Sequence, residues 1–189
     1  MHDIEPFYLW QPLYQSNEDK RSPFYGRTYS EIYFDQKIYN HIIHPQWDNI
    51  GSETLFIKVL FADYEDEFMI IEMIGEWNDC LYNDIMTFKR DVIDLAIEDG
   101  ITKFVLIGEN VLNFHASDDA YYEEWFEDID GGWIALINFH EHVLSEMKKE
   151  RLHYYLTMGE AFNELDWRRM KPNDILSWVE EQLDKKYLP

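Results

Sequence analysis

Five side chains able to bind or polarise a ligand follow predicted strands: Trp77, Asn78, Glu109, Asn110 and His115. Loops at the carboxyl ends of parallel strands lie together, and α/β proteins usually bind their ligands there. Imidazole and carboxylate groups suit a divalent metal or acid–base chemistry. A small-molecule hydrolase or a metal-dependent enzyme with its site at these strand ends is therefore the alternative function we consider.

The spacing of the reactive residues does not favour catalysis. His140 and His142 are two residues apart on a predicted helix, so their rings point to different faces. Cys80 begins another predicted helix without a histidine close in sequence to act as its base. There is no glycine-rich phosphate loop of either the dinucleotide or the lysine-containing type. We therefore predict no catalytic residue, no metal ion and no cofactor.

The stretch from Glu109 to Gly132 is the most acidic part of the chain. It lies in a region without any Lys or Arg, and it interleaves Glu123, Glu124 and Trp125 with further aromatic residues. Carboxylates beside aromatic rings are a composition that docks a basic protein. The alternative is a solvated helix that is anchored by residues four apart, namely Tyr121, Trp125 and Ile129.

The overall charge narrows the class of partner. The 189 residues carry 38 acidic and 16 basic side chains, for a formal net charge of -22. Such a field repels phosphate backbones and anionic lipids, so we expect neither a nucleic-acid partner nor a membrane surface, whereas a basic protein fits. With one cysteine and no basic, apolar leader at its start, the sequence predicts a cytoplasmic protein; the oligomeric state is not encoded in these features.

Two regions differ in texture. Residues 1–53 are rich in Tyr, Phe and Trp and interrupted by four prolines, and short extended segments or one hairpin are expected near residues 29–43. We predict that 1–53 is an aromatic-rich arm that packs on an α/β domain of residues 54–189, because so many exposed rings would favour aggregation. A separate recognition surface is the other interpretation of the arm.

The apolar pattern gives the elements of the main domain. Apolar runs at 54–61 and 68–75 predict a β-hairpin. A 3.6-residue period over 81–96 predicts a five-turn helix, which is capped by Asn78 or Asp79 and ends at Gly100. The apolar run at 104–107 predicts a strand.

The stretch 133–151 is expected to form a helix, followed by a strand at 154–158 and a helix that begins near Pro172. If 133–139 were instead a strand, the fold would move toward the flavodoxin type.

This order predicts a mixed sheet that starts with a β-hairpin and continues βαβαβα, with helices packed on the sheet. It resembles the STAS-like fold, the family of the sporulation anti-sigma-factor antagonist and of the cytoplasmic tails of sulfate transporters. The strand Lys103–Ile107, followed by Val111, Phe114 and Ser117, looks like the strand and loop that lead to the family's phosphorylated serine. The resemblance implies a phosphorylation site at Ser117, although the family's Asp-Ser-Ser/Thr-Gly is missing. It also implies a non-enzymatic regulatory or protein-interaction domain.

Overall fold

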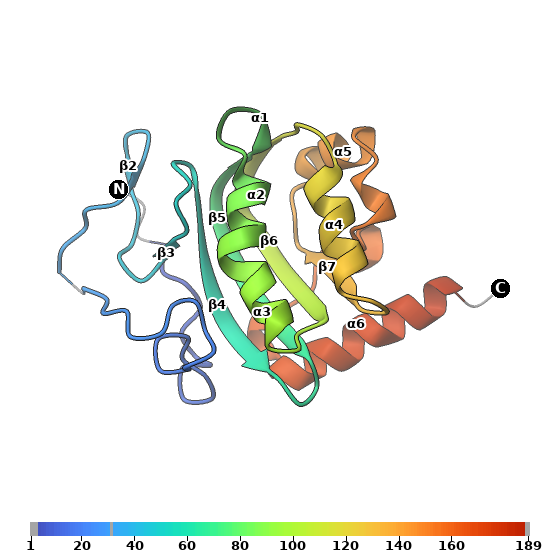
Figure 1. The fold of residues 1–189 in the computed structure, drawn as a ribbon, viewed down its shortest axis with the longest axis horizontal. Helices are drawn as coiled ribbons and strands as arrows, with labels where there is room; N and C mark the ends of the chain where they lie inside the picture. Colours follow the sequence, from blue (N-terminus) through green and yellow to red (C-terminus); the bar gives the residue numbers. More distant parts are fainter. Residues whose placement is uncertain (1–3, 31, 188–189) are drawn as a thin grey trace.

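A mixed five-stranded sheet forms the centre of the protein (Figure 1). The computed structural model describes residues 4–30 and 32–187, so residues 1–3 and 31 of the predicted arm and the last two residues lie outside the described part. The sheet order is β3-β4-β5-β6-β7, in which β3 and β4 run antiparallel to their next neighbours and β5, β6 and β7 run parallel. The strands are β3 (Asp48–Asn49), β4 (Leu55–Asp63), β5 (Phe68–Asn78), β6 (Lys103–His115) and β7 (Trp133–Ile137).

The predicted hairpin is confirmed. β4 and β5 pair antiparallel from Leu55↔Gly75 to Asp63↔Phe68. All residues of β5 except Glu76 are buried, which explains why its sequence is almost continuously apolar. In the arm, β1 (Lys37–Ile38) and β2 (His41–Ile42) form a second, small hairpin.

The helix after β5 is interrupted, not continuous as predicted. It consists of α1 (Asp79–Tyr82), α2 (Asp84–Phe88), a π-helical turn (Lys89–Ile93) and α3 (Asp94–Glu98). Asn83 lies in the left-handed region with φ 53°, which separates α1 from α2. Consequently Leu81 is 73% exposed, although the helical period placed it on the buried face. The Asn78 cap and the stop at Gly100, whose φ is +96°, are confirmed.

The helix predicted for residues 133–151 is wrong. Trp133–Ile137 is strand β7, which pairs in parallel with Lys103–Ile107 of β6, and the helix α5 (Glu141–Lys149) begins only after Asn138, whose φ is 55°. The 3.6-residue period had joined two buried elements across this break. The strand predicted at 154–158 is also wrong, because it is a 3-10 turn (Leu152–Tyr154) followed by a single bridge between Ala135 and Thr157.

The acidic stretch supplies the missing helix, α4 (Ala120–Asp128), as the solvated-helix alternative predicts. The order of hairpin and βαβαβα is therefore confirmed, but α4, β7 and α5 occupy its later places. The strands follow one another in sequence across the sheet and β4 is antiparallel to β5, so the sheet does not have the order of a flavodoxin.

The two faces of the sheet have different covers. Right-handed crossovers between neighbouring parallel strands place α1 to α4 on one face, and α5 joins them there (Figure 1). The other face is covered by the N-terminal arm and by the last segment, including the 3-10 turns Glu160–Phe162 and Trp167–Arg169 and helix α6 (Pro172–Tyr187). Within the described part, no helix is long and apolar enough to cross a bilayer.

Candidate functional site

The end of β5 forms a closed, hydrogen-bonded cluster around Asp79. The indole of Trp77, which is fully buried, donates to Asp79 Oδ1 at 2.9 Å, and the hydroxyl of Tyr122 donates to Asp79 Oδ2 at 2.6 Å. The backbone N–H of Ile85 donates to Oδ1 at 2.8 Å. Burial raises the pKa of Asp79 to about 6, and the hydrogen bonds oppose this rise. Both carboxylate oxygens are satisfied within the protein, so this cluster joins α1 and α4 to the sheet.

Glu109 lies inside β6 and not in a loop, because this strand continues to His115 instead of ending at Ile107. Its carboxylate accepts hydrogen bonds at 2.8 Å from the Asn138 amide and from the Trp167 indole, and it forms an ion pair with Arg168. Burial raises the pKa of Glu109, but the hydrogen bonds, first of all that from Arg168, outweigh burial and hold the pKa below its ordinary value. Glu109 therefore connects the last segment of the chain to the sheet.

Glu72 is a buried carboxylate that the sequence analysis missed. It is 1% exposed in the middle of β5, accepts the backbone N–H of Phe7 at 2.8 Å, and lies 3.4 Å from Arg168 Nη2. Burial raises its pKa to about 7, against the opposing hydrogen bond from Phe7 and the charge of Arg168. A single carboxylate in an apolar run is the signal that could have identified it. Together with Lys58 on β4, which is paired with Glu72 in register, and Glu109 on β6, it forms a polar band across this face.

The remaining predicted strand-end residues do not converge with Glu109. His115 is exposed at the end of β6, in register with the buried Asn78, and Ser117 is exposed in the following loop. Asn110 is half-buried in register with Ile74 and lines a small cavity of about 180 Å³ beside the arm. Among residues 4–30 and 32–187, no group of three His, Cys, Asp or Glu side chains is arranged to hold a metal ion.

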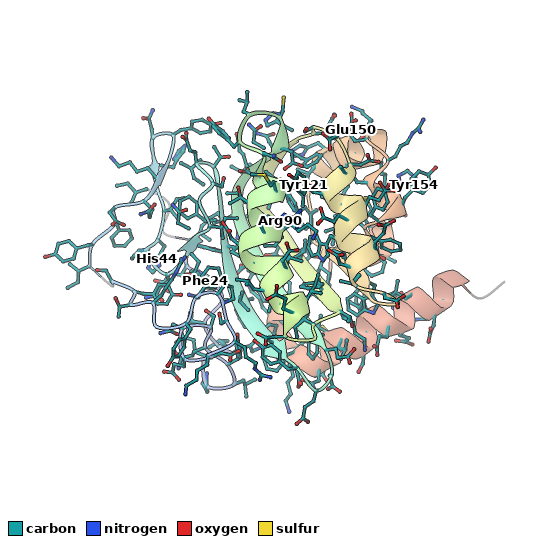
Figure 2. The ribbon with its side chains drawn as sticks, in the orientation of Figure 1. Phe24, His44, Arg90, Tyr121, Glu150 and Tyr154 are labelled. Atoms are coloured by element: carbon teal, nitrogen blue, oxygen red, sulfur yellow. The ribbon has the colours of Figure 1, made fainter. Side chains whose placement is uncertain are left out.

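The acidic helix α4 turns only part of its predicted site residues outward. Trp125 is fully buried, Glu124 is half-buried, and Glu123 is exposed. Glu124 accepts from Lys89 at 3.2 Å and pairs with Arg90 at 2.7 Å (Arg90 is labelled in Figure 2). Of the three predicted residues, Glu123 alone carries a fully exposed charge.

The arm buries some of its apolar side chains and exposes others. Trp10, Phe24, Ile38, Ile43 and Trp47 are buried. In contrast, eight of the thirteen large apolar residues that are exposed among those whose burial the structure describes belong to the arm: Tyr8, Leu9, Leu13, Tyr25, Ile32, Tyr33, Phe34 and Tyr39. Ile32 and Tyr33 are 80% and 77% exposed. Figure 2 shows this part of the chain extending from the sheet beyond His44. The division of the chain at residue 53 stays a prediction. Strand β3 of the arm pairs with β4, so the arm contributes a strand to the sheet of the main domain.

Comparison with known proteins gives a structural neighbour. The fold is similar to the crystal structure of a "putative anti-sigma factor antagonist" from Thermotoga maritima, with 15% sequence identity and a TM-score of 0.43 over 66% of this chain and 92% of the neighbour. The description of this neighbour names the family whose resemblance the sequence suggests. No family model and no curated protein matches the sequence.

Proposed function

We propose that this chain is a non-enzymatic, cytoplasmic regulatory domain that binds a protein partner through its N-terminal arm. The observation that carries the proposal is the concentration of exposed apolar side chains on the arm, led by Ile32 and Tyr33. Exposed aromatic and aliphatic side chains that lie close together on a soluble domain usually mark an interface.

The charge of the molecule favours a basic partner. At a formal net charge of -22, the protein attracts cationic proteins and repels nucleic acids at long range. On α4, Glu123 and Glu127 are exposed, whereas Glu124 and Asp128 are neutralised by Lys89 and Arg90. The exposed pair therefore contributes to the rate of association, whereas the apolar residues of the arm provide contact area.

The arm is tested by replacing both Ile32 and Tyr33 with Ser. These side chains are almost fully exposed, so the fold should be unchanged. We expect a partner that is cross-linked to the wild-type chain in its native cells to be recovered at least about tenfold less with the variant. The purified partner should bind the purified variant with an affinity lowered by the same factor. Leu81→Ser, at a position 73% exposed on α1, is the matched control and should retain the partner. If every cross-linked protein is recovered equally with all three chains, the proposal is wrong.

A further inference from the structure

The outer edge of β4 is mostly unpaired. β3 pairs with β4 only at Phe56 and Ile57. For Lys58–Asp63, the described part of the chain provides no neighbouring strand on the outer side and no backbone hydrogen bond from the arm. In an antiparallel strand, about half of the backbone N–H and C=O groups point to each side. A register shift lies between Val59 and Phe61, so this edge presents free donors and acceptors on either side of a β-bulge.

The arm wraps around this edge without filling the space beside it. Phe7 packs on one face of the sheet, where its ring lies 4.9 Å from that of Trp167, and Tyr14 packs against the apolar cluster of the other face. Between the arm and the strand lies a cavity of about 450 Å³, lined on the strand side by Lys58, Val59 and Leu60. Side chains of consecutive strand residues point to opposite faces, so a cavity lined by all three faces the backbone edge itself.

The arm side of the cavity offers hydrogen-bonding groups. Gln11, Gln15 and Gln46 line it, and within the described ranges their side-chain amides make no hydrogen bond. Ser16 also lines the cavity, but it is 1% exposed and its hydroxyl oxygen is turned away from the open space. A backbone segment placed here would meet donors and acceptors on both sides.

The charges at the cavity balance, because Lys58 and Glu5 line it and Asp48 and Arg27 lie beside Lys58. Asp48 is fully buried and lies 3.1 Å from Arg27 Nη1 and 3.2 Å from Lys58 Nζ, so one carboxylate faces two cations. Lys58 Nζ also lies 3.6 Å from the centre of the Tyr29 ring. A neutral segment is therefore favoured over a charged one, whatever the charge of the whole partner.

We propose that the outer edge of β4 is a strand-addition site, where an extended segment of the protein partner pairs with Lys58–Asp63 inside the arm. The inference rests on the proposed interaction function and specifies its binding mode. Backbone groups on a strand edge are complementary to another extended backbone, which gives affinity, while the flanking side chains give specificity. Tyr8, which is 57% exposed and lines the cavity, provides apolar contact at its rim.

The test uses capped six-residue peptides with the full chain, followed by the amide signals of β4 in nuclear magnetic resonance titrations. The first peptide alternates threonine and valine, the second carries lysine at its centre, and the third is the first peptide with alternate amide nitrogens methylated. We expect shifts confined to Lys58–Asp63 and the glutamine amides, a loss of at least about tenfold in affinity on methylation, and weaker binding of the lysine peptide.

Two variants control for the position of the site. Gln15→Trp fills the cavity and should abolish the shifts, whereas Glu18→Trp, at an exposed position that does not line the cavity, should leave them unchanged. Equal binding of the methylated peptide, or no shifts with any peptide, would overturn the inference. The titration needs no native partner, so loss of partner recovery in the Ile32 and Tyr33 variant is a separate outcome that tests only the proposed function.

Discussion

The two faces of the sheet differ in how they are covered. On the helix face, α1 to α5 bury a large cluster that is almost entirely apolar, with Asp79, Asp84 and Lys89 as its buried charged side chains. On the arm face, irregular segments together with helix α6 cover a smaller cluster that is crossed by the polar band of Lys58, Glu72 and Glu109.

The difference follows from the needs of the backbone. A helix satisfies its own N–H and C=O groups, whereas an irregular segment has to find partners elsewhere. On the arm face these partners are side chains: Glu72 accepts the N–H of Phe7, and Asn138 both accepts the N–H of Leu165 at 2.9 Å and donates to its carbonyl at 2.8 Å. Irregular segments that cover a sheet therefore require polar side chains in the interior. The stability of this face depends on these individual hydrogen bonds more than that of the helix face does.

Two buried tryptophans give the largest expected effect and compare the faces directly. Trp125→Ala on the helix face and Trp167→Ala on the arm face should each lower the free energy of unfolding by about 4 kcal/mol, because both side chains are fully buried. Trp125→Phe should cost little, since the Trp125 indole N–H has no partner among the described residues. Trp167→Phe should cost about 2 kcal/mol more, because it removes the hydrogen bond to the charged Glu109.

Urea unfolding measures the stabilities, and limited proteolysis measures the local effect. We expect Trp167→Ala to expose residues 4–30 and the last segment to cleavage while the helix face remains protected. Equal losses for the two phenylalanine variants, or cleavage spread evenly over both faces, would show that the faces are not energetically distinct.

The sequence predicts the helix face better than the arm face, for a physical reason. The hairpin, the cap at Asn78, the stop at Gly100 and the burial of Trp125 depend on local patterns, and each is found in the structure. The error at Trp133 arises because a short, wholly buried strand followed by an amphipathic helix imitates one longer helix.

The arm face depends on contacts between residues far apart in the sequence, which leave no local pattern. The bond from Phe7 to Glu72 spans 65 residues, and that from Arg168 to Glu72 spans 96. For the same reason, Glu109 is a predicted binding residue whose partners Asn138, Trp167 and Arg168 were not predicted. The predicted binding role of the site residues, Glu123 and Ser117 included, stays a prediction.

Lys89 is the buried cation of the helix face, and its substitution tests how much a buried charge stabilises that face. Its side chain is fully buried, and its Nζ lies 2.6 Å from Asp94 and 2.7 Å from Asp128. Lys89→Ala should lower the free energy of unfolding by about 3 kcal/mol, because it removes both the buried stem and the cation that the carboxylates share. Lys89→Met retains the apolar stem and should lose only part of this. A larger loss for Met than for Ala in urea unfolding would contradict this account.

The smallest expected difference between the two faces is in how their stability depends on pH. Glu72 on the arm face and Asp79 on the helix face have pKa values raised by burial to about 7 and about 6. The folded protein binds each proton more tightly than the unfolded chain does, so this contribution to stability is present below the ordinary carboxyl pKa and is lost as the pH rises through the folded value. Asp79 should therefore lose its contribution by pH 6, and Glu72 by pH 7.

Glu72→Gln and Asp79→Asn remove these titrations one at a time. As the pH rises from about 5 to about 8, the free energy of unfolding of Glu72→Gln should increase by about 1 to 2 kcal/mol relative to that of the wild type. For Asp79→Asn, the corresponding relative increase should occur at lower pH. Glu65→Gln, at an exposed turn, should follow the wild type throughout. Urea unfolding at several pH values measures the differences. If the free energy of unfolding of Glu72→Gln changes with pH as steeply as that of the wild type between about pH 6 and pH 8, the titration of Glu72 does not affect the stability of the arm face.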